Sequence, residues 1–145
     1  MPVAWGVAVA GIFVWLGMVL AISFMEAPLK FHAPGVTLQV GLGIGRLVFR
    51  ALNASELVLG VMVLVALQFE PPPARVMVAI LVAVVMLAVQ LIAVRPALTR
   101  RSDVVLADEQ GVGTRRRSRG HYVYIGLELI KAIALLVSGI LLLAA

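Results

Sequence analysis

Four long apolar stretches alternate with short polar breaks along the chain. They have about 19 to 23 residues each, and a helix rises about 1.5 Å per residue, so each stretch is long enough to cross a hydrocarbon core about 30 Å thick. The pattern predicts an all-α integral membrane protein whose single domain is a four-helix transmembrane bundle. The predicted spans are residues 3–25, 51–69, 76–94 and 121–143.

Prolines and charges mark the ends of these spans. Pro28 and Pro34 each remove a backbone donor and disfavour helix at the preceding residue, so they end the first span. The sequence EPPPAR at 70–75 predicts a tight turn, since three prolines cannot continue a helix. Residues 97–120 form the one sizeable polar segment, and we expect a basic loop there.

Residues 36–50 are apolar but rich in glycine. They suit either an interfacial helix near 36–48 or the lower part of the second span. Gly41 and Gly45 form a GxxxG pair, which permits close helix approach in membranes. With Gly6, Gly11 and Gly17 they suit close contacts within the chain or between copies, so a homo-oligomer is expected.

Composition strengthens the membrane prediction. Hydrophobic residues make up 63% of the 145 positions and charged residues 13%, whereas a soluble chain is roughly half apolar and about a quarter charged. A soluble fold of this size has too little interior for so much apolar surface. The chain has no cysteine, which excludes a disulfide framework, a thiolate metal site and a cysteine nucleophile.

The net charge of +5 is concentrated beside the spans. Basic residues favour the cytoplasmic side of a membrane. The two basic loops, at 26–50 and 97–120, are therefore expected in the cytoplasm and both termini outside the cell membrane. The first span is expected to be a retained helix and not a cleaved signal peptide. No Lys or Arg precedes it, its apolar run is too long, and no small-residue cleavage site follows. No nucleic-acid binding is expected, because no aromatic platform accompanies the basic run. That run should instead contact anionic lipid headgroups through Arg115, Arg116, Arg117 and Arg119.

Three glutamates lie near the span ends that should face the cytoplasm. Glu26 closes the first span, Glu56 lies about five residues into the second, and Glu128 lies about seven residues into the fourth. The last two should therefore sit about 8–11 Å below the same surface and meet inside the bundle. Because charges are costly in a membrane, we expect a ligand or ion pocket that also includes His121 and Tyr124.

Helical spacing places these residues on polar stripes. Glu56 shares a stripe with Arg46 and Arg50, while Glu128 shares one with Lys131. The three basic residues are the expected charge partners. Two readings stay open: the pairs only fix helix packing, or the stripes line a pocket for a cation, a proton or a polar headgroup.

No catalytic residue and no cofactor are predicted, and the metal content is left unknown. His121 with Glu56 and Glu128 offers nitrogen and oxygen ligands for a metal, but the spacing is no recognised signature. A haem held by two histidines would need His32 to fold back toward His121.

Several stretches resemble a family of small four-helix membrane proteins found in bacteria, with eukaryotic relatives linked to tolerance of platinum drugs. The similar stretches are FMEAPLKFHAPG, GRLVFRALNASELVLG, LIAVRPAL and RGHYVYIGLELIK, which are spread between residues 24 and 131 of the chain. The family is not assigned a reaction, so the resemblance implies four spans and leaves the activity open. The basic segment at 97–120 is longer than the family's loop.

The sequence RALNASE at 50–56 is similar to a motif of membrane enzymes of eicosanoid and glutathione metabolism, which also have four helices. Arg50, Asn53 and Glu56 match that motif with one residue missing after Ala51, and such a slip rotates the motif by about 100° on a helix. The resemblance implies a lipid-modifying enzyme as an alternative.

The leading hypothesis is therefore a non-enzymatic protein whose cytoplasm-facing polar pocket binds or moves a cation or small polar solute. A second hypothesis is a structural or accessory subunit of a larger membrane complex, in which the polar stripes only hold helices together.

Overall fold

The computed structural model describes residues 1–94, 96, 100 and 119–145. The predicted basic loop at 97–120 lies largely outside this part of the chain, as do the headgroup contacts expected of Arg115, Arg116 and Arg117. The described chain is helical, without a β-strand in any described segment. The all-α prediction is confirmed.

Four helical units are long and apolar enough to cross a membrane, namely Val3–His32, Leu38–Phe69, Ala74–Ala93 and Tyr122–Leu143. The first comprises α1 (Val3–Val19), a π-helical segment (Leu20–Glu26), α2 (Ala27–Leu29) and a 3₁₀ turn (Lys30–His32). The others are α3 (Leu38–Phe69), α4 (Ala74–Val89) with a π-helical end (Gln90–Val94), and α6 (Arg119–Leu143).

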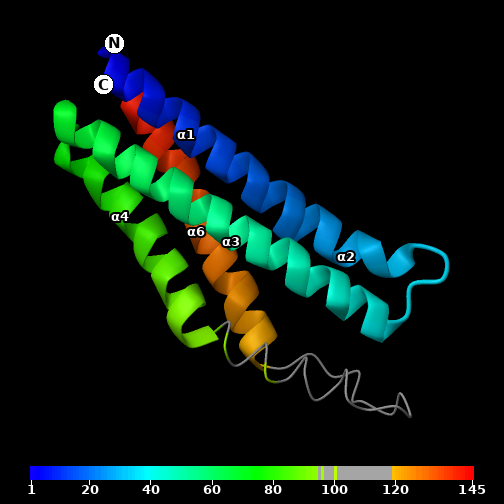
Figure 1. Cartoon of the computed structure of the whole chain (residues 1–145). Coiled ribbons are helices and arrows are strands. Elements are labelled where there is room, and N and C mark those ends of the chain that lie inside the picture. Colours follow the sequence, from blue (N-terminus) through cyan, green and yellow to red (C-terminus); the bar gives the residue numbers. More distant parts are fainter. Residues whose placement is uncertain (95, 97–99, 101–118) are drawn as a thin grey trace.

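The helices form an up-and-down bundle (Figure 1). The two termini and the turn between α3 and α4 lie at one end, and the connection from α2 to α3 lies toward the other. α1 packs against α3 and α6, and α4 packs mainly against α6. α6 therefore contacts both α1 and α4, just as α1 contacts both α3 and α6.

Short connections give the antiparallel order. Residues 33–37 join the first unit to α3; Gly35 adopts a φ of +79°, and the Thr37 hydroxyl accepts a hydrogen bond from the Val40 amide at 3.2 Å to cap α3. At the opposite end the Trp5 indole donates to the Glu70 carbonyl at 2.8 Å. That bond ties the start of α1 to the turn of prolines before α4.

Residues 38–48 belong to α3 and do not form a separate interfacial helix. α3 has 32 residues and is therefore about 48 Å long, more than the ~30 Å of hydrocarbon. Figure 1 shows α2 and the start of α3 reaching beyond the ends of α4 and α6. Of the two alternatives for the 36–50 segment, the structure has the continuous helix.

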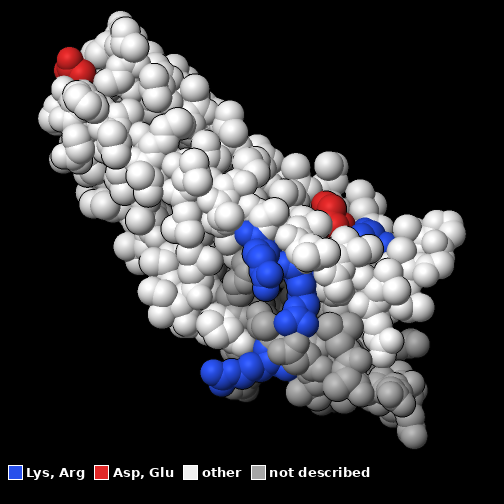
Figure 2. All heavy atoms as spheres, in the orientation of Figure 1, with Lys and Arg blue, Asp and Glu red and all other residues white. Residues whose placement is uncertain are grey.

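Apolar side chains fill the interior and also cover the outside. The buried core includes Ile12, Trp15, Leu67, Ile80 and Leu135. Large exposed hydrophobic side chains run along all four helical units, which is the surface that lipid requires. Figure 2 shows Lys and Arg on the half of this face that lies away from the termini, whereas the half nearer the termini is white apart from one acidic side chain.

Three of the five glycines expected at close contacts are found there. A Cβ at Gly11 would meet Val63 at 2.9 Å, one at Gly45 would meet Lys30 Nζ at 2.9 Å, and one at Gly41 would overlap the Phe31 ring. Gly6 and Gly17, by contrast, have no neighbour within 4 Å in the chain. The GxxxG pair of α3 thus receives the end of the first helical unit.

Gly139 offers a test of the α1–α6 contact. A Cβ there would lie 2.8 Å from Phe13 Cζ and 3.3 Å from Ile12 Cγ2, so Gly139→Ala should lower the free energy of unfolding by about 1–3 kcal/mol through overpacking. Unfolding in mixed detergent micelles measures the change. Gly126→Ala is the matched control, because no atom lies within 4 Å of its Cβ position and the change should be within about 0.5 kcal/mol. Equal effects of the two variants would contradict the packing argument.

Candidate functional site

Four polar side chains from three helical units meet inside the bundle. Glu56 comes from α3, Gln90 from the π-helical end of α4, and Glu128 and Lys131 from α6. Glu56, Gln90 and Lys131 are fully buried, and Glu128 is 1% exposed. Such groups are rare at membrane depth, so their contacts carry the chemistry of the molecule. We call these four side chains the polar cluster.

The Lys131 ammonium group is the centre of the polar cluster. Its Nζ lies 2.5 Å from Glu56 Oε2, 2.6 Å from Glu128 Oε1 and 2.7 Å from Gln90 Oε1. An ammonium group has three N–H donors and no acceptor, so three oxygens use its full capacity. Lys131 thus links α3, α4 and α6 through one nitrogen.

Neutral donors add further hydrogen bonds to the two carboxylates. The Trp15 indole donates to Glu56 Oε2 at 2.8 Å, and the Ser23 hydroxyl donates to Glu128 Oε2 at 2.7 Å. The Gln90 amide donates to Glu128 Oε1 at 2.7 Å. The first helical unit therefore joins the other three at this level of the bundle.

Both π-helical segments supply a residue to this site. Ser23 lies in the segment Leu20–Glu26, and Gln90 opens the segment Gln90–Val94. A π-helical turn adds a residue to the α-helical repeat and so changes the direction of the side chains beyond it, and such turns recur at functional sites. The irregular backbone is thus found where two helices turn a polar side chain inward.

The polar cluster is not electrically balanced. It has two carboxylates and one ammonium group, which gives a formal charge of −1 when all three are ionised. No described residue forms a hydrogen bond with Glu56 Oε1 or with either polar atom of the Asn53 amide, although Asn53 is only 3% exposed. A buried polar atom without a partner costs about 1–3 kcal/mol. The α3 side of the polar cluster therefore has unused hydrogen-bonding capacity and unbalanced charge.

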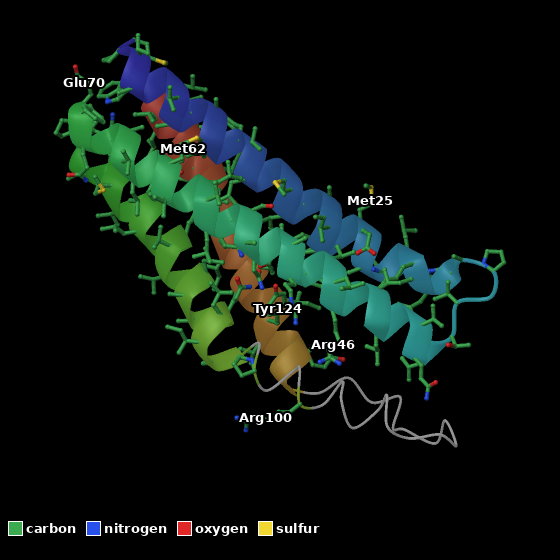
Figure 3. The ribbon with its side chains drawn as sticks, viewed as in Figure 1. Met25, Arg46, Met62, Glu70, Arg100 and Tyr124 are labelled. Atoms are coloured by element: carbon green, nitrogen blue, oxygen red, sulfur yellow. The ribbon has the colours of Figure 1, made fainter. Side chains whose placement is uncertain are left out.

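The sequence-predicted pocket residues are only partly brought together. Glu56 and Glu128 share Lys131, and Tyr124 lies one helical turn before Glu128, with its backbone oxygen 3.4 Å from Gln90 Nε2. Figure 3 shows Tyr124 between the ribbons of α3 and α6. Glu26 stands apart, 3.8 Å from Lys30. The side chain of His121 lies outside the part of the chain that the structure describes.

The charge partners differ from expectation. Lys131 neutralises Glu56, the role that the spacing on α3 gave to Arg46 or Arg50. Arg50 is exposed whereas Asn53 and Glu56 are buried, so the trio that resembled the glutathione-enzyme motif does not share one face.

Three aromatic rings and the Lys30 ammonium group lie beside the polar cluster. The rings of Phe49 and Tyr124 meet edge to face with centroids 5.7 Å apart. Lys30 Nζ lies 5.7 Å from the Phe49 centroid and 5.4 Å from that of Phe31, within the range of cation–π attraction. Through these rings the end of the first helical unit contacts α3 and α6 next to the polar cluster.

Three members of the site were not selected from the sequence. Gln90 was visible as the one polar residue within the span 76–94, but no rule linked it to Lys131. Trp15 is an apolar core side chain by its burial, and its indole donor adds a polar role to that packing. Ser23 gave no signal, because a single serine is common in membrane helices.

The described residues contain no group of three His, Cys, Asp or Glu side chains placed to hold a metal ion. The polar cluster offers oxygens of two carboxylates and of the Gln90 amide, and Asn53, one helical turn before Glu56 on α3, adds an amide oxygen. Oxygen donors of this kind suit hard cations or protons and not soft transition metals.

Removing the ammonium group should strongly destabilise the bundle. Lys131→Met leaves two buried carboxylates without a counter-charge, and the expected loss is about 3–5 kcal/mol of unfolding free energy in detergent. The double variant Lys131→Met/Glu56→Gln should recover part of that loss, giving a coupling energy above about 1 kcal/mol. Lys30→Met is the matched control, because its ion pair with Glu26 spans 3.8 Å near a helix end. Additive effects of the two cluster substitutions would rule out the pairing.

Compared with protein-family profiles, with characterised proteins and with solved structures, the chain matches none of them. The polar cluster, with its charge and its unpartnered atoms, is therefore the feature from which a function follows.

Proposed function

We propose that the chain is a multi-pass membrane protein that binds one small cation, a metal ion or a proton, at the polar cluster. The observation that carries this proposal is that two buried carboxylates share a single ammonium group, which leaves one negative charge in excess when both are ionised. One further positive charge would neutralise the site. Membrane proteins that move ions or protons place ionisable side chains in the same way, inside the bundle and away from lipid.

The shape of the site supports binding of a small ligand. Every donor of Lys131 is used, the indole of Trp15 donates to Glu56, and the hydroxyl of Ser23 donates to Glu128. Little room remains for a large solute between groups that are already 2.5–2.8 Å apart. The unpartnered atoms on α3 are separate oxygens and one nitrogen, which suits an ion of atomic size.

Orientation forms part of the proposal. Lys and Arg gather on the half of the molecule away from the termini (Figure 2), and by the positive-inside rule that half lies toward the cytoplasm. Both termini and the turn of prolines then lie outside. Arg115, Arg116, Arg117 and Arg119 would contact anionic headgroups of the cytoplasmic leaflet.

A second candidate is a structural or accessory subunit. The observation in its favour is that Lys131 alone links α3, α4 and α6, which is what a helix clamp requires. Such a protein would be recovered from mild detergent with a stoichiometric partner, and its stability would not respond to ions.

Trp15 provides a direct reporter of cation binding. The chain has two tryptophans, so Trp5→Phe leaves Trp15, whose indole donates to Glu56, as the sole source of tryptophan emission. In this background we expect the fluorescence to change saturably with a metal cation or with pH. Glu56→Gln should abolish the response, because it removes the charge that the indole senses. An unchanging signal with every ion and at every pH would exclude cation binding and favour the structural subunit.

Cysteine labelling tests the orientation. Since the chain has no cysteine, Pro72→Cys and Ser102→Cys each introduce one thiol, in the proline turn and in the basic segment. In intact cells a membrane-impermeant maleimide should label position 72 and spare position 102. Permeabilised cells give the control for reactivity, and labelling of 102 in intact cells would reverse the assigned orientation.

A further inference from the structure

Two neighbouring side chains on α3 have polar atoms for which no described residue provides a partner. Glu56 is fully buried, and its Oε1 has no hydrogen bond, while Asn53 is 3% exposed and neither of its amide atoms has one. Polar groups this deeply buried are nearly always satisfied by protein, water or an ion. Their presence together calls for a shared partner.

The two side chains lie close together on one face. They are three residues apart in a continuous helix, where Cβ atoms at that spacing are about 5–6 Å apart. Glu56 Oε2 is held at 2.5 Å by Lys131 and at 2.8 Å by Trp15, so the carboxylate cannot turn its free oxygen toward those donors. Oε1 is therefore left for a ligand other than the ammonium group.

The charge of that ligand follows from its neighbours. The titratable groups that bond to or flank Glu56 are Glu128 and Lys131, both from α6, whereas Trp15 from α1 and Gln90 from the end of α4 carry no charge. The excess is one negative charge, and one positive charge cancels it. A divalent ion would change the net charge of the site from one negative to one positive.

We propose that a small monovalent metal ion such as Na⁺ binds between Glu56 Oε1 and the Asn53 amide oxygen, an inference that rests on the proposed function and assigns its ligand. A carboxylate and an amide oxygen are the hard donors that such an ion takes. The two oxygens of the Glu56 carboxylate then have different partners. Oε2 contacts the Lys131 ammonium group, which belongs to the chain, and Oε1 contacts the bound ion, which can exchange.

The experiment titrates the Trp5→Phe protein in detergent with LiCl, NaCl and KCl at constant pH, with choline chloride keeping the ionic strength fixed. Trp15 emission should saturate with one of the three ions and not with choline. Asn53→Ala should weaken the apparent affinity by about 10- to 100-fold, the range for loss of one interaction with a charge. Asn53→Ser retains an oxygen on a shorter side chain, so its apparent ion affinity should lie between those of the parent protein and Asn53→Ala.

Ser138→Ala is the matched control. Ser138 is a fully buried polar residue of α6 whose hydroxyl donates to the Leu135 carbonyl, away from the polar cluster, so its removal should leave the ion affinity within about twofold. Thermal unfolding of each variant in choline checks that it folds.

The outcomes separate this inference from the proposed function. An ion response that Glu56→Gln abolishes and Asn53→Ala leaves unchanged overturns the Asn53 site and keeps cation binding. A response to pH alone shows that a proton balances the charge, which overturns the metal ion and again keeps the proposed function. Absence of any response in the parent protein overturns both.

Discussion

One ammonium group holds the four-helix arrangement in register. Lys131 contacts oxygens from α3, α4 and α6 within 2.5–2.7 Å, and each of those partners is itself bonded to another buried group. In a bilayer no water can replace these bonds, and breaking a buried pair by removing one member typically costs about 3–5 kcal/mol. Apolar packing brings the helices together, but the rotation of each helix about its axis is specified by which side chain reaches Lys131.

That constraint explains why the backbone is irregular at two places and regular elsewhere. α3 and α6 direct their polar residues inward with ordinary helical spacing, as Glu128 and Lys131 show at positions i and i+3. The first helical unit and α4 reach the same point through π-helical turns, which carry Ser23 and Gln90. A strictly α-helical continuation would change the direction of these segments relative to the polar cluster.

The sequence was sufficient for the architecture because the signal lies in long uniform stretches. Four apolar runs, punctuated by Pro28, Pro34 and the three prolines at 71–73, predict four helices whatever the side chains between them do. It was also sufficient to single out Glu56, Glu128 and Lys131, since ionisable residues in such runs are rare. The continuity of α3 through residues 38–48 was one of two alternatives, because glycine-rich apolar sequence suits both.

The partners within the site depend on the rotation of one helix against another, which a linear pattern does not contain. Spacing on α3 pointed to Arg46 or Arg50 as the partner of Glu56, since both are neighbours along the chain. The structure provides Lys131, which lies 75 positions later and inside the bundle, while Arg50 stays exposed. Gln90 and Ser23 could not be assigned to the site from the sequence for a related reason. Their inward direction depends on π-helical turns, which no residue pattern in the sequence predicts.

The position of Lys131 along the chain has a consequence for how the protein is made. α3 enters the membrane before α6 has been synthesised, so Glu56 is without its ammonium partner during that interval. A lone carboxylate is costly at membrane depth, so the bundle of the first three helical units is incomplete in polar contacts as well as in packing. Arrival of α6 supplies the ammonium group that Glu56 lacks, together with Glu128.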